Sequence, residues 1–118
     1  MTHKPNIVIV QADQLTALCL NAYGKPLALT PNIDKIAAQG TIFANTYCNS
    51  PVCGPSRAGM MTGRIPSNVG VFDNAGEFLS SEPTFAHYLR ALGYQTTLCG
   101  KMHFVGPCLL YTSPSPRD

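Results

Sequence analysis

The sequence predicts an α/β fold, with a largely parallel sheet flanked by helices. Apolar, β-branched runs alternate along the chain with segments that carry the spacing and capping residues of helices. A continuous apolar run such as residues 7–10 suits a strand that is buried on both faces, as strands of parallel sheets are. The resulting order of strand, helix, strand, helix, helix and strand is typical of this fold class.

The first part of the chain is expected to hold two strands and one helix. A polar cluster that includes Asp13 follows the first strand at its carboxyl end, where open α/β sheets bind ligands. A helix should begin with Thr30 as N-cap and Pro31 at the first helical position, and it should end at Gly40. Residues 41–47, which have an alternating apolar pattern, are then expected to form the second strand.

The second part of the chain is expected to add two helices and a third strand. Residues 55–61 should open a short helix. The Pro-Thr pair at residues 83–84 should begin another helix, whose apolar stripe ends at Gly93. His87 within that helix is expected to be a surface or packing residue. Residues 94–99 should form the last strand.

Composition excludes several classes of protein. The length of 118 residues allows one domain at most, and the net charge of +2 gives no argument for a nucleic-acid or membrane partner. The apolar start is too short for a secretory signal, so a cytoplasmic protein is expected. The odd count of five cysteines argues against a disulfide scaffold. Cys19, Cys48 and Cys99 are therefore expected to be buried free thiols in a reducing compartment.

The last residues break the pattern of the rest of the chain. Residues 108–118 have no helical or strand period, and they resemble the conceptual translation of a transposase-type sequencing adapter. We therefore expect residues 1–107 to be the natural sequence and residues 108–118 to be a non-native tail. The alternative is a natural, disordered tail rich in Pro and Ser.

A pentapeptide in the middle of the chain carries the most specific signal. Residues 53–57 read Cys-Gly-Pro-Ser-Arg, between a predicted strand and a predicted helix. This segment resembles Cys-x-Pro-Ser-Arg, the signature by which sulfatases mark one cysteine for oxidation to formylglycine. The likeness extends over residues 4–107. It implies the amino-terminal part of a sulfatase catalytic domain with an alkaline-phosphatase-like α/β core, truncated in this chain.

The resemblance implies a catalytic set of Cys53, Arg57, Lys101 and His103. A formylglycine at position 53 hydrates to a geminal diol, and one hydroxyl attacks the sulfur of the ester and expels the alcohol. Loss of the proton from the other hydroxyl then ejects sulfate and restores the aldehyde. Arg57, one helical turn on, can reach back to position 53. The alternative for Cys53 is an unmodified buried thiol.

A metal site is implied at the end of the first predicted strand. Sulfatases carry an Asp-Asp pair there, and this chain has Asp13-Gln14, a form that resembles choline sulfatases and phosphonate monoester hydrolases. Oxygen ligands of this kind suit Ca²⁺, with Mg²⁺ or Mn²⁺ as alternatives. The implied metal set is Asp13, Gln14 and the formylglycine derived from Cys53. In the alternative interpretation, Asp13 only caps a turn.

A substrate-binding set is implied by two further segments. Residues 93–103 resemble the second sulfatase signature, in which Lys101 and His103 bind sulfate oxygens and the histidine assists proton transfer. Their alternation along an extended segment places both side chains on one side. An Asp-Asn-Ala segment resembles choline sulfatases and implies that Asn74 lies in the substrate pocket. The alternative for Asp73-Asn74 is a plain loop turn.

These likenesses together predict a sulfuric ester hydrolase that cleaves choline sulfate to choline and sulfate. The alternatives are an arylsulfatase, a phosphonate or phosphate monoester hydrolase of the same superfamily, and a non-catalytic metal-binding module. The implied partners are a small-molecule sulfate ester and a maturation enzyme that generates formylglycine. The resemblance is also compatible with a full-length protein that forms homo-oligomers. The 118-residue chain by itself is expected to be poorly folded and inactive, since its sheet edges and apolar helix faces lack cover.

Overall fold

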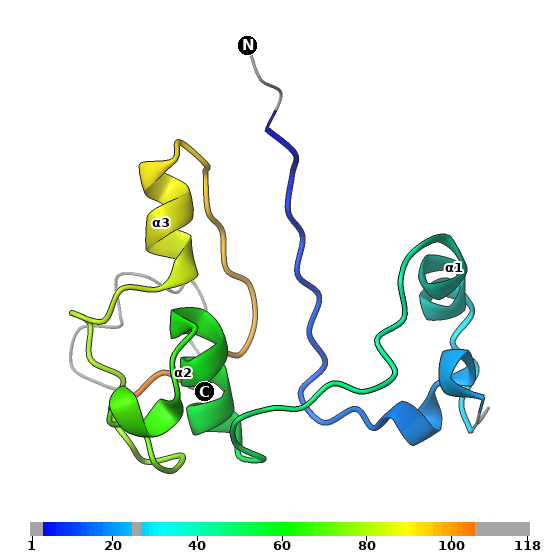
Figure 1. Ribbon diagram of the computed structural model, residues 1–118, viewed down its shortest axis with the longest axis horizontal. Coiled ribbons are helices and arrows are strands. Elements are labelled where there is room, and N and C mark those ends of the chain that lie inside the picture. Colours follow the sequence, from blue (N-terminus) through cyan, green and yellow to red (C-terminus); the bar gives the residue numbers. More distant parts are fainter. Residues whose placement is uncertain (1–3, 25–26, 106–118) are drawn as a thin grey trace. The chain divides into compact units, whose positions relative to one another are not determined.

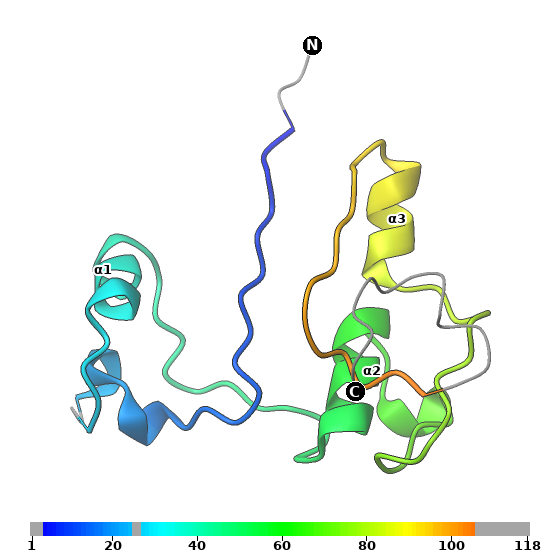
Figure 2. The same ribbon diagram turned by 180° about the vertical axis from the view of Figure 1, so that it is seen from behind.

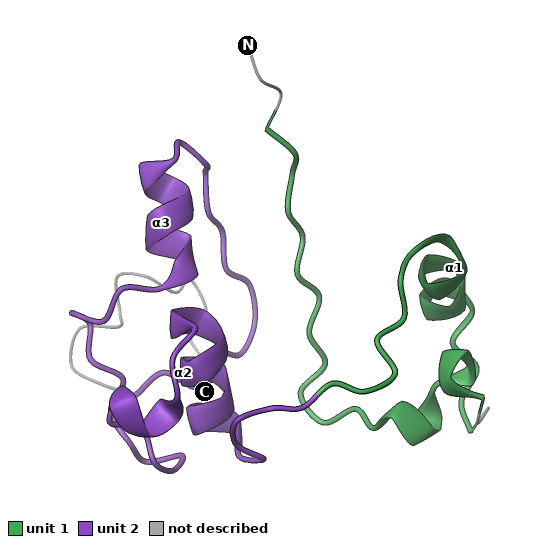
Figure 3. Ribbon diagram, in the orientation of Figure 1, with its two compact units in different colours: residues 1–46 green, residues 47–118 purple. Residues whose placement is uncertain are grey.

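The computed structural model describes residues 4–24 and 27–105, so the predicted tail at residues 108–118 lies outside the described residues. Within the described part, three α-helices and three short 3₁₀ helices are connected by irregular segments (Figure 1). The chain divides into two compact units, Met1–Thr46 and Tyr47–Asp118 (Figure 3). None of the described helices is long and apolar enough to cross a membrane.

The first unit is organised around one α-helix. Its elements are the 3₁₀ helices η1 (Ala17–Cys19) and η2 (Asn21–Tyr23) and the helix α1 (Pro31–Gln39). Asp34 connects them, because its carboxylate accepts a hydrogen bond of 3.2 Å from the Thr30 hydroxyl and one of 3.4 Å from the Asn21 amide. These two contacts hold the start of α1 against η2.

The predicted bounds of α1 are confirmed. Thr30 is the N-cap, Pro31 is the first helical residue and Gly40 is the C-cap. Proline is favoured at this first position because its fixed φ suits the helix and its missing N–H would have no partner there. The Thr30 hydroxyl bonds to the Asp34 side chain instead of a backbone N–H.

The second unit contains the helices α2 (Cys53–Thr62) and α3 (Phe85–Ala91), with the 3₁₀ helix η3 (Pro66–Asn68) between them. The predicted short helix is confirmed, although it begins at Cys53 and not at residue 55. It ends at Gly63, whose φ of +68° is a left-handed conformation that glycine adopts without strain. Six residues of α2 are buried, which makes it the central element of this unit: Gly54, Pro55, Arg57, Ala58, Gly59 and Met61.

A small apolar core lies beside α2. Ala58 of that helix packs with Val69, Val71 and Phe78, and each of these is at least 95% buried. The Phe104 ring stacks on Phe78, with 4.7 Å between the ring centroids. This core fixes both ends of the loop that follows Val71, and it also fixes the chain next to residue 103.

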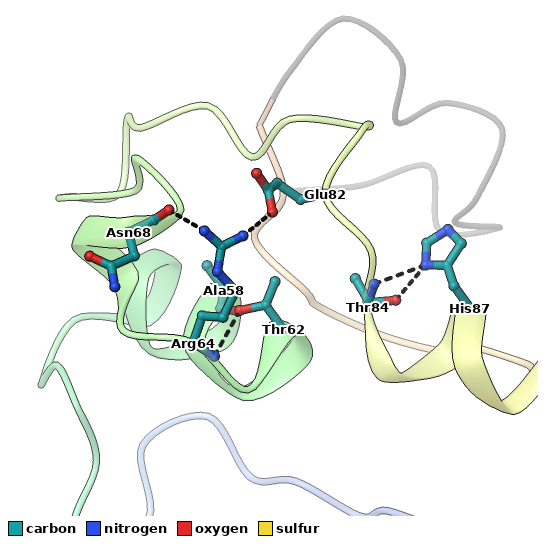
Figure 4. Close-up of polar contacts among 7 residues, drawn as sticks. All are labelled: Ala58, Thr62, Arg64, Asn68, Glu82, Thr84 and His87. Carbon is teal, nitrogen blue, oxygen red and sulfur yellow. Dashed lines mark hydrogen bonds and ion pairs between the residues drawn. The ribbon is translucent and has the colours of Figure 1, made fainter.

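Polar contacts connect the end of α2 to the segment that leads into α3 (Figure 4). The Arg64 guanidinium pairs with the Glu82 carboxylate at 2.6 Å and donates to the main-chain carbonyl of Asn68 at 2.7 Å. The Thr62 hydroxyl accepts from the Arg64 N–H at 3.2 Å and donates to the Ala58 carbonyl at 2.8 Å. Because Arg64 is half-exposed, we expect the ion pair to orient these segments more than to stabilise them.

Helix α3 begins where the Pro-Thr pair predicted, with Thr84 as its N-cap. The Thr84 N–H donates to Nδ1 of His87 at 3.1 Å, and the Thr84 hydroxyl lies 2.8 Å from the same nitrogen (Figure 4). The imidazole therefore takes the place that Glu or Gln holds in a capping box. His87 has a structural role at the helix start, beyond the surface or packing role that was predicted for it.

The sheet that the sequence predicted is not formed in the part of the chain that the structure describes. Residues 7–10, 41–47 and 94–99 carry no strand there. A strand forms only where a neighbouring strand supplies main-chain hydrogen bonds, and apolar composition cannot replace that partner. The side chains meant for burial stay accessible, with Val8 82% and Val10 91% exposed. The predicted lack of cover on helix faces is confirmed, since Ile36 of α1 and Tyr88 of α3 are also more than half exposed.

Candidate functional site

Cys53 is the first residue of α2. The residue before it, Val52, is the N-cap and has an extended backbone, and its carbonyl accepts the N–H of Ser56 at 3.0 Å. The Ser50 hydroxyl accepts the Val52 N–H at 3.3 Å and holds the approach to the helix. Cys53 is half-buried. The positive end of the helix dipole therefore lies at this thiol, and it favours negative charge there.

Gly54 connects this helix start to a distant loop. Its N–H donates to Oδ1 of Asn74 at 2.8 Å. A Cβ atom on Gly54 would stand 3.1 Å from the Asp73 carbonyl oxygen and 3.2 Å from Asn74 Oδ1. Only glycine lets the loop come this close without a shift. The sequence motif leaves position 54 unspecified, so this role was not foreseen.

The loop that carries Asn74 is a tight turn. The Asp73 carboxylate accepts the N–H of Ala75 at 2.9 Å, and the Asp73 carbonyl accepts the N–H of Gly76 at 3.3 Å. The alternative interpretation of Asp73-Asn74 as a loop turn is thus correct, and Asn74 is one of the two central residues of the turn. Asn74 itself reaches out of the turn to Gly54, so the turn serves to present it.

His103 contacts the same loop. Its Nε2 lies 3.2 Å from the Asn74 carbonyl oxygen. A carbonyl can only accept, so the ring carries its proton on Nε2 in this contact. Nδ1 is buried and has no hydrogen-bond partner. The backbone of His103 is also unusual, because φ is +55°, a conformation that side chains other than glycine rarely adopt.

Arg57 and Lys101 are linked through the main chain. Arg57 is 5% exposed, and its Nη1 donates to the Lys101 carbonyl oxygen at 2.5 Å. After α3 the chain reverses its direction and runs back toward α2 (Figures 1 and 2), where the bond from Arg57 holds residue 101. The structure therefore shows Arg57 holding the segment that carries Lys101 and His103. Its predicted reach to position 53 stays a prediction.

Five of the seven predicted site residues are thus brought together in the second unit by these contacts: Cys53, Arg57, Asn74, Lys101 and His103. The other two, Asp13 and Gln14, are exposed residues of the first unit. Their oxygen atoms suit a hard cation. Within residues 4–24 and 27–105, however, no three His, Cys, Asp or Glu residues form a group that could hold a metal ion. The predicted metal set stays a prediction.

The remaining described cysteines differ from their predicted burial. Cys48 and Cys99 are exposed, and Cys19 is half-buried, although all three are free thiols as expected. Cys99 ends the segment predicted as a strand at residues 94–99, and Cys48 directly follows the one predicted at residues 41–47. Their burial depended on the sheet, and without the strand pairing their side chains stay accessible.

Comparison with known proteins identifies the family. The Sulfatase family model matches residues 5–106, which is most of the chain.

The chain belongs to the sulfatase family.

Individual sulfatases support this assignment. Over 110 residues the chain is 46% identical to a choline-sulfatase of Rhizobium meliloti (strain 1021), with 93% of this chain and 22% of that protein covered. It is 41% identical over 114 residues to human arylsulfatase A, with 91% and 22% covered. It is 39% identical over 104 residues to an N-acetylglucosamine-6-O-sulfatase of Bacteroides thetaiotaomicron, with 88% and 19% covered. The chain spans about a fifth of the length of these relatives.

The match confirms the family that the motifs predicted. Sulfatase family membership implies the alkaline-phosphatase-like α/β fold, although the sheet itself stays a prediction for this chain. It also argues against the alternative of a non-catalytic metal-binding module, since the proteins that the chain resembles are sulfate ester hydrolases by name.

Proposed function

We propose that this chain is the amino-terminal part of a sulfate ester hydrolase whose nucleophile derives from Cys53. The observation that carries the proposal is the meeting of three segments around the start of α2. Cys53 begins the helix, and the Asn74 side chain accepts the N–H of Gly54. Arg57 holds the main chain that carries Lys101 and His103. Their association matches what anchoring and cleaving a sulfate group requires.

Positive charge and hydrogen-bond donors would bind the anion. A sulfate ester carries negative charge on oxygen, and the start of α2 favours negative charge. Lys101 adds an exposed ammonium group on the segment that Arg57 holds. Asn74 uses Oδ1 for Gly54, so its amide group keeps donors for a substrate oxygen. Lys101, His103 and Asn74 are the proposed substrate-binding residues.

Cys53 would require conversion by a formylglycine-generating maturation enzyme. Formylglycine at this position would supply the hydrated aldehyde whose hydroxyl attacks sulfur. The protein contributes a proton acceptor: because Nε2 of His103 donates to Asn74, the lone pair on Nδ1 is the one left to take a proton. Arg57 is proposed as the fourth member of the catalytic set, and it acts from the second turn of α2.

We propose that Asp13 and Gln14 hold a divalent cation, Ca²⁺ first and Mg²⁺ or Mn²⁺ as alternatives. Both supply oxygen, which hard cations prefer. Two such ligands are fewer than the six to eight oxygens that Ca²⁺ takes, so further ligands are required, including position 53 after its conversion. Such a cation would offset the negative charge of a bound sulfate and favour loss of a proton from the hydroxyl that acts as nucleophile.

Choline sulfate is the proposed substrate, in a cytoplasmic enzyme. The supporting observation is the 46% identity to a choline-sulfatase, together with the Asp13-Gln14 and Asn74 segments. An arylsulfatase is the second candidate, favoured by the 41% identity to human arylsulfatase A. A choline enzyme needs aromatic and acidic side chains around the quaternary ammonium group, which distinguishes the two.

The test uses the full-length protein, meaning the product of the complete reading frame that contains this chain, coexpressed with a formylglycine-generating enzyme. We expect mass spectrometry to find formylglycine at position 53 and turnover to be faster with choline sulfate than with an aryl sulfate or a phosphonate monoester. Cys53→Ala should abolish turnover, and Cys48→Ala, at an exposed free thiol, should leave it unchanged. Equal turnover by wild type and Cys53→Ala would refute the proposal.

Two further proposals concern the 118-residue chain itself. We propose that residues 108–118 are a translated sequencing adapter, and a source coding region without an adapter match would refute this. We also propose that the purified 118-residue chain is inactive, because it contains about a fifth of the length of related sulfatases. Turnover of a sulfate ester by that chain would refute the second proposal.

A further inference from the structure

Asn74 makes two hydrogen bonds to two different parts of the site. Its side-chain Oδ1 accepts the N–H of Gly54 at 2.8 Å, and its main-chain oxygen accepts from Nε2 of His103 at 3.2 Å. Gly54 follows Cys53 at the start of α2, and its N–H belongs to the first turn, whose donors have no partner within the helix. One residue therefore caps the helix of the nucleophile and also holds the histidine ring.

The loop of Asn74 is built to hold that position. The turn is closed by the Asp73 carboxylate, which accepts the Ala75 N–H at 2.9 Å. Val71 before the turn is 2% exposed and Phe78 after it is 5% exposed, so both ends are fixed in the core. The stacked ring of Phe104 anchors the residue after His103 in the same core. The two partners of Asn74 and its own loop thus share one rigid support.

The fit between the loop and the helix start is close. A Cβ atom on Gly54 would meet three atoms of residues 73 and 74 at 3.1 to 3.3 Å, two of them main-chain atoms. The contact is therefore made by main chain against main chain, with the amide oxygen of Asn74 completing it. Because this contact is closely packed, a shift of the loop would also move the start of the helix and Cys53.

We propose that Asn74 is a positioning residue, which sets the start of the Cys53 helix through its side chain and the ring of His103 through its main chain. The inference rests on the proposed function for its catalytic meaning, and it goes beyond the substrate contact that the family resemblance implied. Loss of the amide oxygen would release Gly54 and let Cys53 move relative to His103. The nucleophile and the proton acceptor would then be misaligned, which slows the chemical step.

The test compares Asn74→Ala, Asn74→Asp and the control Asn68→Ala in the full-length protein. Asn68 is an exposed residue of the same unit, and the contact described for it uses its main-chain oxygen, which the substitution keeps. Hydrogen–deuterium exchange of the peptide that contains Gly54 reads the helix cap in the substrate-free protein. Turnover of choline sulfate gives kcat and KM separately, and a thermal melt gives Tm.

We expect Asn74→Ala to raise the exchange rate at Gly54 about tenfold and to lower kcat about tenfold, the effect of one lost hydrogen bond. Asn74→Asp keeps an acceptor oxygen at the helix start and should restore slow exchange. Asn68→Ala should match wild type in exchange and in kcat.

Unchanged exchange at Gly54 in Asn74→Ala would overturn the proposal. So would a rise in KM with kcat unchanged, which indicates a substrate contact alone, or faster exchange and a lower Tm with kcat unchanged, which indicates a purely structural cap. A wild-type protein without turnover of any sulfate ester would overturn the proposed function instead. The exchange of Gly54 would still decide in that case whether Asn74 holds the helix start.

Discussion

The guanidinium of Arg57 donates a hydrogen bond of 2.5 Å to the main-chain carbonyl of Lys101, across 44 residues of sequence. Arg57 belongs to the pentapeptide that begins with Cys53, and Lys101 begins the Lys-x-His segment that ends with His103. The two sulfatase motifs are therefore joined directly, through a buried cation and a backbone oxygen. This contact gives Arg57 a structural role that its place in the motif did not reveal.

Replacing Arg57 should separate the two motifs. Arg57→Lys keeps the charge but lacks the planar fork of donors, so we expect the bond to the Lys101 carbonyl to be lost or weakened and kcat of the full-length protein to fall about tenfold. The measurement is turnover of choline sulfate, with Arg90→Lys in the exposed last turn of α3 as the matched control. A kcat for Arg57→Lys equal to that of the control would show that the bond has no role in turnover.

Adding a methyl group at Gly54 should push the Asn74 loop away from the helix start. In Gly54→Ala the new Cβ would stand 3.1 Å from the Asp73 carbonyl oxygen, and main-chain atoms yield poorly. Overpacking of this kind costs about 1–3 kcal/mol, so Tm should fall, and kcat should fall about tenfold or more because Cys53 moves.

Gly70→Ala is the comparison for that variant. A Cβ at Gly70 meets nothing within 4 Å, and the substitution carries only the strain of a φ of +80°. It should lower Tm by costing about 1–2 kcal/mol and leave kcat unchanged. If both variants lose activity equally, the close contact at Gly54 has no special importance for turnover.

Replacing His87 should weaken the start of α3. His87→Ala removes the acceptor for the Thr84 N–H, and loss of a cap contact costs about 1 kcal/mol. His87→Gln puts at this position the residue that normally completes a capping box and should retain most of the stability. Thermal unfolding of the full-length protein, followed by circular dichroism, compares the two. A Tm for His87→Gln as low as that for His87→Ala would contradict the capping role.

Helix ends were predictable from sequence because their signals are local. Thr30 and Pro31 mark the start of α1, and Thr84 marks the start of α3, and each lies at or directly before the first helical residue. The start of α2 is the exception. Cys53 precedes Pro55 by two residues, and the helix begins there because the side chain that satisfies Gly54 comes from Asn74, 20 residues away.

Strands were not predictable in the same way. The run at residues 7–10 has the composition of a buried strand, yet its side chains are exposed and no strand is assigned to it in the structure. Pairing depends on a second segment at the right place, which a local pattern does not specify. The same limit holds for contacts between site residues. The sequence motifs indicated Asn74 and His103 as site residues, but they did not predict the hydrogen bond between them.

Asp13 provides the most direct test of the metal proposal. Asp13→Asn replaces a charged oxygen ligand with a neutral one, and affinity for a hard cation falls with the charge of its ligands. We expect the full-length protein to lose turnover when treated with a chelator and to regain it with Ca²⁺. Asp13→Asn should require about tenfold to a hundredfold more Ca²⁺ for half-maximal recovery. Asp34→Asn is the matched control from the same unit, because its carboxylate bonds to Thr30 and Asn21 in the structure. An equal Ca²⁺ requirement in the two variants would show that Asp13 is not a ligand, because binding the metal is the role that the proposal gives to Asp13 and not to Asp34.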